Sequence, residues 1–353
     1  MKCINRTAPY VGVLSAAALF IFAASTRTSD AVERDRNVVS PASTLCANQS
    51  KGPLPTNLSE WAEGAQLFAG LGTFHREVST GSKEAQAYFD QGMRFLWAFN
   101  HDEATRSFAK AARDDPHCAM CYWGVALTLG PNYNLPMMAE PRAKVAWEAL
   151  QLALQNAGSA TPVEQALISA LSSRYPNPWP LDPSNGGSVL LAYSLAMQDV
   201  ASKFPDDLDI QTLTAEAMMN TNAWKLWQLD GTPAPGTEAI VARLQAVLAK
   251  DPNHPGANHY YIHAVEASSH PEKGVGAAER LPGMMPAAGH LEHMPAHIMQ
   301  RVGRYADAPR PIGEVPPLTW PNSQRRRPRT TTRQCIRLIT ISSWPSRRRP
   351  KCC

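Results

Sequence analysis

Between residues 61 and 308 most of the chain carries apolar residues at the three- and four-residue spacing of amphipathic helices. The clearest stretch, "YFDQGMRFLWAFNHDEATRSFAKAARDDP", begins at Tyr88 and predicts two helices, the second closed by a proline. Small residues such as Gly92 and large ones such as Phe108 would let the two helices pack closely as an antiparallel pair. Because the pattern recurs with variation, we expect an all-α fold of antiparallel helix pairs.

Three later segments give helix boundaries. "TPVEQALISALSSRY" begins with Thr161 as N-cap and Pro162 at the first helical position, and it places Glu164 for a capping box. "SVLLAYSLAMQDVASKFPDD" and "GTEAIVARLQAVLAKDPNHP" predict the second helices of two pairs, which end before Pro205 and Pro252. "GPNYNLP", residues 130–136, predicts a loop between helices that could line a binding surface.

The spacing resembles the tetratricopeptide repeat, with its signature W-x2-L-G-x2-Y, then A-x3-F, then P. The matching residues are Tyr88, Gly92, Phe95, Ala104, Phe108 and Pro116, and Gln91 departs from the usual leucine. "CAMCYWGVALTLGPNYN", "HPGANHYYIHAVEAS" and "GHLEHMPAHIMQRVGRY" are similar to an exported bacterial subgroup of tetratricopeptide proteins of unassigned activity. The resemblance implies an α-solenoid, a right-handed superhelix, that binds a peptide or protein partner on its concave surface. The candidate groove residues are Arg94, Trp97, Asn100, Tyr122, Trp123 and Asn132.

The N-terminal segment predicts export. Lys2 and Arg6 precede the apolar run "YVGVLSAAALFIFAAS", and small residues near Ser25 offer a cleavage site, so residues 1–25 read as a signal peptide. The run is shorter than the ~20 residues that span a bilayer, and no later run is longer. We therefore expect a periplasmic or extracellular protein without a membrane span, in which residues 26–60 form a disordered linker.

The C-terminal segment, residues 309–353, departs from the repeat. Its prolines and arginines prevent the second helix expected at Ala308, which suggests disorder or a shifted reading frame. Arg325, Arg326, Arg327 and Arg329 leave open a basic tail that binds nucleic acid or anionic lipid. Since the whole chain is +4 and this segment is +10, the remainder carries −6, which gives no support to nucleic-acid binding by the body.

Seven of the ten histidines fall between residues 254 and 297, and they are the strongest chemical signal. On a continuous helix, the side chains of one set would lie within about 60° of arc; this set is His259, His263, Glu266 and His270. Pro295 separates His290 and His293 from the helix that carries His297. If the two segments converge, they could bind zinc, iron or copper, alone or as the centre of an enzyme. The alternative is that these histidines pack between repeat helices.

Two sulfur patterns carry further alternatives. Cys118-x-x-Cys121 predicts a structural disulfide or two buried thiols, or a redox pair at a helix start. Nearby methionines would suit copper(I), or fill gaps in helical packing; they are Met284, Met285, Met294 and Met299. No H-E-x-x-H motif, phosphate loop or nucleophile elbow is present. We therefore predict no catalytic residues and favour a binding scaffold, which needs no cofactor, over an enzyme.

Overall fold

The computed structural model describes residues 54–182 and 184–308. The predicted signal peptide, most of the linker and the whole basic tail lie outside the described residues. Within the described ranges all regular structure is helical, apart from isolated bridged pairs such as Asn132 with Leu135. The all-α prediction is therefore confirmed. None of the helices in these ranges is both long and apolar enough to cross a bilayer.

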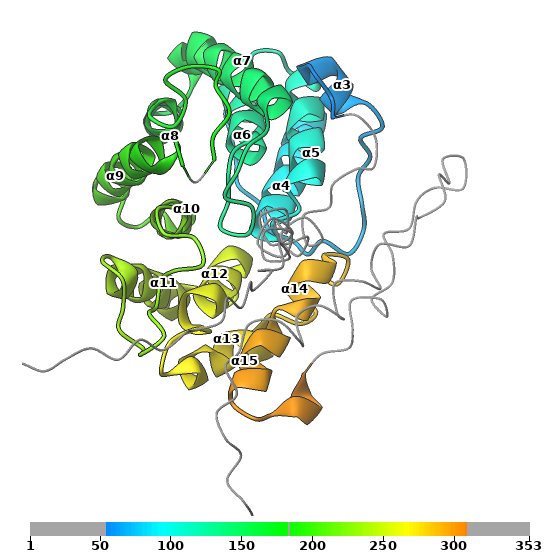
Figure 1. Ribbon diagram of the computed structural model, residues 1–353. Helices are drawn as coiled ribbons and strands as arrows, with labels where there is room; N and C mark the ends of the chain where they lie inside the picture. Colours follow the sequence, from blue (N-terminus) through cyan, green and yellow to red (C-terminus); the bar gives the residue numbers. More distant parts are fainter. Residues whose placement is uncertain (1–53, 183, 309–353) are drawn as a thin grey trace, which may run out of the picture. The chain divides into compact units, whose positions relative to one another are not determined.

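The helices follow one another along the chain as Figure 1 shows. They are α3 (Leu58–Ala62), α4 (Lys83–Trp97), α5 (His101–Asp114), α6 (Ala119–Leu129), α7 (Glu140–Asn156), α8 (Pro162–Ser172), α9 (Gly187–Lys203), α10 (Leu208–Asn220), α11 (Thr237–Lys250), α12 (Pro255–Val265), α13 (Val275–Arg280), α14 (Gly289–His293) and α15 (Pro295–Arg301). Short 3₁₀ turns occupy Ala157–Ser159, Pro271–Gly274 and Tyr305–Asp307.

The predicted helix boundaries agree with the capping contacts. Thr161 caps α8, since its hydroxyl accepts a hydrogen bond from the Glu164 amide, and the Glu164 carboxylate accepts one from the Thr161 amide at 2.7 Å. This reciprocal pair satisfies two backbone donors that a helix N-terminus otherwise leaves free. Helices α9 and α11 end at Lys203 and Lys250, shortly before the prolines that were expected to stop them.

Helices α4, α5 and α6 pack around one aromatic side chain. The ring of Phe108, on α5, is fully buried between Gly92 on α4 and Gly124 on α6. A Cβ atom at either glycine would clash with this ring, so the close approach of the helices depends on the missing side chains. The small and large residues of the repeat pattern thus meet as expected.

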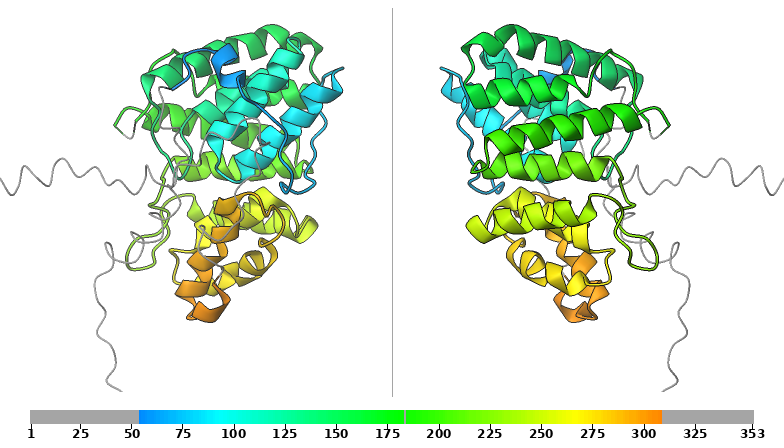
Figure 2. Two further views of the ribbon diagram at one scale, coloured as in Figure 1. Left: turned by 90° about the vertical axis from the view of Figure 1, so that its right-hand side faces the viewer. Right: turned by 90° about the vertical axis from the view of Figure 1, so that its left-hand side faces the viewer.

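Consecutive helices pack against each other from α4 through α12, as the green helices of Figure 2 illustrate. Helix α12 also contacts α4, although more than 150 residues separate the contacting groups. Gly256 permits this contact, because a Cβ atom there would clash with the Trp97 ring. Because α12 packs on α4, His259 of the histidine-rich segment lies at the C-terminal end of α4. The superhelical form implied by the repeat resemblance stays a prediction.

Candidate metal centre

Helix α12 positions the first two histidines of the site. Pro255 occupies its first turn, and the His254 side chain accepts a hydrogen bond from the Ala257 amide as the N-cap. The helix ends at Val265, whose carbonyl oxygen accepts hydrogen bonds from both the amide and the hydroxyl of Ser268. The helix therefore stops before His270.

The expectation of a four-residue face on α12 is accordingly wrong at His270. Since the helix has already ended, His270 lies in the following turn, 62% exposed, and its Nδ1 pairs with Glu272 Oε1 at 3.0 Å. Glu266 follows the last residue of the helix and stays beside His263. The spacing of the histidines does not reveal that Ser268, three residues beyond Val265, ends the helix.

His259 and His263 lie one turn apart on α12, and both side chains are buried. His259 Nδ1–H donates to the Trp97 carbonyl oxygen at 2.6 Å, which leaves its Nε2 with a free lone pair. His263 Nδ1–H donates to Glu266 Oε1 at 2.9 Å. The His263 Nε2 is buried and has no hydrogen-bond partner among the described residues. Each ring is thus fixed with Nε2 free of hydrogen.

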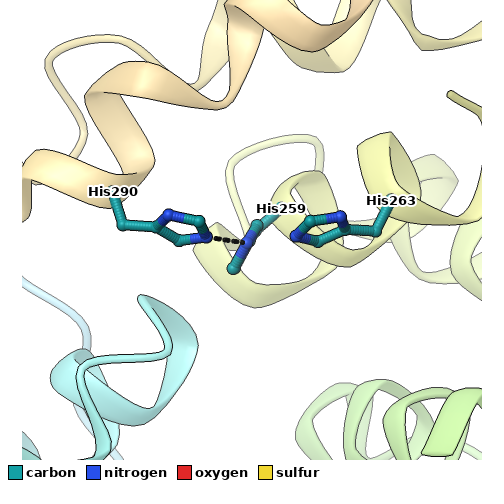
Figure 3. Close-up of side chains that lie close together, drawn as sticks. All are labelled: His259, His263 and His290. Atoms are coloured by element: carbon teal, nitrogen blue, oxygen red, sulfur yellow. Dashed lines mark hydrogen bonds between the residues drawn. The ribbon is translucent and has the colours of Figure 1, made fainter. Parts of the chain in front are cut away.

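His290, on α14, completes a group of three. Its Nε2 lies 3.1 Å from His259 Nε2, and one ring nitrogen from each of His259, His263 and His290 lies within 4.8 Å of the others. Figure 3 shows the His290 ring reaching from its own helix toward the two rings of α12. Asn134 Nδ2, from the loop before α7, lies 3.4 Å from His290 Nε2. The two histidine-rich segments therefore converge.

The Glu266 carboxylate binds one member of the group, His263, and the neighbouring His297. Glu266 Oε2 accepts a hydrogen bond from His297 Nδ1 at 2.5 Å, while Oε1 accepts the one from His263. Burial by itself would raise the pKa of the Glu266 carboxyl, but the nearby His297 and His263 outweigh it and hold this pKa well below its ordinary value. Glu266 is therefore ionised and fixes the orientation of His263, as carboxylates behind metal-binding histidines do.

Burial keeps the three imidazoles neutral. Burial lowers the pKa of His263, and it lowers the pKa values of His259 and His290 well below 6.5, with neighbouring histidines adding to each effect. Burial also lowers the pKa of His293 to about 4. A histidine must be neutral to bind a metal ion, and near pH 7 His259 and His263 already present an unprotonated Nε2 to the group.

Phe99 forms one wall of the group. It follows α4 in a left-handed conformation, φ 51°, and the amide of Asn100 donates to the Phe95 carbonyl oxygen. This is the C-terminal cap that normally uses glycine. The Phe99 ring centroid lies 4.6 Å from that of His259, 5.8 Å from that of His263 and 6.2 Å from that of His290. An unfavourable backbone conformation thus places one aromatic ring against all three histidines.

Trp224 forms a second wall, also from a left-handed position, φ 62°. Its ring stacks on Tyr133 with centroids 5.2 Å apart, and both rings contact His263, at 5.8 Å and 5.2 Å. Phe99 and Trp224 are the two non-glycine residues with positive φ within the described ranges. Such conformations cost about 1–3 kcal/mol each and tend to gather at functional sites.

The remaining predicted ligands lie beside the group rather than in it. The rings of His293 and His297 are 5.0 Å apart, and the His297 ring is 5.9 Å from that of His263. The four methionines considered for copper belong to the hydrophobic core or pack against it. Cys118 and Cys121 form a disulfide at the start of α6.

The predicted groove residues are mostly internal. Trp97, Tyr122, Trp123 and Asn132 are buried, whereas Arg94 and Asn100 are partly exposed. The Arg94 Nε–H also donates to the Phe74 carbonyl oxygen at 2.9 Å. Only Arg94 and Asn100 thus present surface to a partner in this conformation, and partner binding itself stays a prediction.

Comparison with known proteins adds no family. No family model matches the chain. No curated protein matches it either. The tetratricopeptide resemblance therefore stays a prediction.

Several site residues carry little signal in the sequence. Phe99 and Trp224 occupy backbone positions where glycine is expected, and nothing in their neighbourhood marks this. The Trp97 carbonyl oxygen and Asn134 join the site only because α12 returns to α4. Tyr133 lies in the loop 130–136, which was expected to line a binding surface, and its composition is the one available clue.

Proposed function

We propose that the protein binds a transition-metal ion of the zinc class through His259, His263 and His290. The observation that carries the proposal is the state of His263: its Nε2 is buried and finds no partner in the part of the chain that the structure describes, while Glu266 holds its Nδ1 in the tautomer that a metal requires. A buried nitrogen left unsatisfied costs about 1–3 kcal/mol, which a bound cation would remove.

The donor set fits this class of metal. Three neutral imidazoles suit zinc, with copper, iron and nickel as competitors, and do not suit calcium or magnesium. Nitrogens about 2.0–2.1 Å from a tetrahedral zinc ion lie about 3.4 Å from each other. The 3.1 Å between the Nε2 atoms of His259 and His290 is close to this value, and small ring rotations would bring in His263, whose nitrogen lies within 4.8 Å.

Three protein ligands leave one position for water or a substrate oxygen, as in catalytic rather than structural zinc sites. The alternative, histidines that merely pack between helices, accounts for His259, whose Nδ1–H is satisfied by the Trp97 carbonyl oxygen. It does not account for the His263 nitrogen that has no partner among the described residues, nor for two strained aromatic residues beside the group, Phe99 against all three rings and Trp224 against His263.

Metal content tests the proposal. Full-length protein dialysed against zinc at pH 7.5 should retain about one ion per chain by mass spectrometry, and titration calorimetry should show one site. His263→Ala should weaken zinc binding by about 100-fold or more, beyond the 10- to 100-fold loss caused by removing an outer-shell partner. His270→Ala is the matched control, because His270 is exposed and outside the group. Equal affinities of the two variants would refute the site.

We further propose that the metal site belongs to an exported protein built from tetratricopeptide-type helix pairs. The packing of Phe108 between Gly92 and Gly124 supports the repeat, since the pattern predicts small residues where helices approach closely. The Cys118–Cys121 disulfide supports an oxidising compartment. Free-thiol titration of protein purified without reductant tests the latter, with full reactivity of both cysteines as the contradicting result.

A further inference from the structure

A small pocket lies directly beside His290. Its volume is about 30 Å³, and His290 forms part of its wall together with Phe99. The other lining residues come from the start of α5, the end of α6, the segment 130–137 and α7, and include His101, Asp102, Asn132, Asn134, Met137 and Arg142. Met137 is 43% exposed. The pocket thus extends from a proposed metal ligand to a residue at the molecular surface.

The pocket walls contain hydrogen-bond acceptors that no group within residues 54–182 and 184–308 satisfies. His101 Nδ1 lies 3.0 Å from the Thr128 carbonyl oxygen and 3.2 Å from Asn132 Nδ2; donation to the closer carbonyl oxygen leaves the buried Nε2 with a lone pair. Asp102 Oδ1 accepts from Arg142, while Asp102 Oδ2 is buried without a partner among the described residues. Asn134 Oδ1 is likewise buried and unpartnered, although its amide nitrogen faces His290.

These three atoms have the same chemical character. A neutral imidazole nitrogen, a carboxylate oxygen and an amide oxygen can each accept a hydrogen bond and cannot donate one. Leaving buried acceptors unsatisfied is unfavourable, so a ligand with N–H or O–H groups would gain by filling the pocket. Because Arg142 pairs with Asp102, the ligand needs no positive charge. The small volume limits it to a few atoms, well below a drug-sized molecule.

We infer that this pocket binds a small molecule that carries an N–H or O–H donor within one or two atoms of an oxygen that ligates the metal. The inference rests on the proposed metal site, since the ligand binds the ion through oxygen where the three histidines leave it open. Small amides and hydroxamic acids have this arrangement. The N–H points to the acceptors of the pocket walls while the carbonyl oxygen reaches the ion beside His290.

A pair of probes isolates the N–H group. Acetohydroxamic acid and N-methylacetohydroxamic acid present the same two metal-binding oxygens, but only the first has an N–H donor. Calorimetric titration of the zinc-loaded full-length protein should show acetohydroxamic acid binding about tenfold more tightly, which is the effect of one buried hydrogen bond.

Two variants separate hydrogen bonding from steric exclusion of the methyl group. Asp102→Asn keeps an oxygen for Arg142 and replaces the unpartnered Oδ2 by a donor, so the preference for the N–H probe should disappear. Asn134→Leu, which removes a different acceptor, should reduce it and serves if Asp102→Asn fails to fold. Asp115→Asn, at the opposite end of α5, is the control and should retain the preference.

The outcomes keep the two proposals apart. A protein that binds no zinc overturns the metal site, and the pocket inference falls with it. A protein that binds zinc but does not distinguish the probes overturns the pocket inference alone. The pocket inference is also overturned if the preference for acetohydroxamic acid survives unchanged in both Asp102→Asn and Asn134→Leu. The methyl group of the other probe would then be excluded by its size.

Discussion

At the residue scale, the site depends on which nitrogen of each histidine is occupied. The Trp97 carbonyl oxygen and the Glu266 carboxylate bind the Nδ1–H groups of His259 and His263, so each Nε2 faces the centre of the group. Spacing along the chain brings histidines onto one helix face but does not say which nitrogen is free. That information comes from the folded contacts, one with a residue three positions away and one with a residue 162 positions away, and it distinguishes a metal site from a packed histidine.

Glu266 offers a test at this scale. Glu266→Gln preserves the shape of the side chain but removes the charge that holds His263 and His297. We expect a 10- to 100-fold loss of zinc affinity with little change in the number of sites, because the carboxylate orients a ligand without binding the ion. Competition titration with a chromogenic chelator measures it. An unchanged affinity would show that Glu266 does not orient His263.

At the element scale, close helix packing depends on glycines that face Phe108. Gly92 and Gly124 leave no room for a side chain, whereas Gly187 at the start of α9 has no atom within 4 Å of the position of its Cβ. The repeat pattern anticipated this arrangement of small and large residues, and it also anticipated the cap of α8 at Thr161. Local signals of this kind are strong because helix geometry fixes which residues meet.

Gly124→Ala tests this packing. We expect it to lower the free energy of unfolding by about 1–3 kcal/mol, because the methyl group would force Phe108 or α6 to move. Gly187→Ala is the matched control and should be neutral or slightly stabilising, since alanine favours the helix. Urea unfolding followed by circular dichroism gives both values. A neutral Gly124→Ala would mean that α5 and α6 are free to separate.

The extent of α12 shows where local signals fail. The histidine spacing favoured a helix through to His270, but Ser268 takes the Val265 carbonyl oxygen and ends it. The left-handed Phe99 was equally invisible, since aromatic residues rarely adopt that conformation. Both features concern single backbone groups, and a pattern averaged over several turns does not resolve them.

At the scale of the whole molecule, the decisive feature is the return of α12 onto α4. The sequence predicted helix pairs and two histidine-rich segments, and it predicted a metal site only if these two segments converge. Whether residues more than 150 positions apart meet depends on the cumulative angles of every pair between them, which no local pattern determines. The contact of Gly256 with Trp97 fixes the outcome.

The buried histidines make stability depend on pH. His101 and His293 have folded-state pKa values lowered by burial to about 3 and about 4, and those of the three proposed ligands are lowered too. At these histidines the unfolded chain therefore binds more protons than the folded protein below pH 6.5. Their contribution to stability is complete above pH 6.5 and is lost as the pH falls toward 4.

We expect the free energy of unfolding of the metal-free protein to fall by about 1.4 kcal/mol per pH unit for each such histidine once its unfolded form is fully protonated. Buried Glu216 and Glu103, whose pKa values burial raises, oppose the loss in the acidic part of the range. His101→Gln should reduce the pH dependence of the free energy of unfolding by the contribution of one protonating group. Urea titrations at pH 7, 6 and 5 measure this slope. An unaltered slope would mean that His101 takes up its proton in the folded state.

The most direct test of the metal centre is the X-ray absorption spectrum at the zinc edge of the loaded, full-length protein. Binding by His259, His263 and His290 predicts about three imidazole nitrogens at 2.0–2.1 Å with one oxygen ligand, and no sulfur at 2.3 Å. His263→Ala should lower the imidazole count by one or abolish the bound ion. A first shell dominated by oxygen, or one unchanged in that variant, would contradict the account.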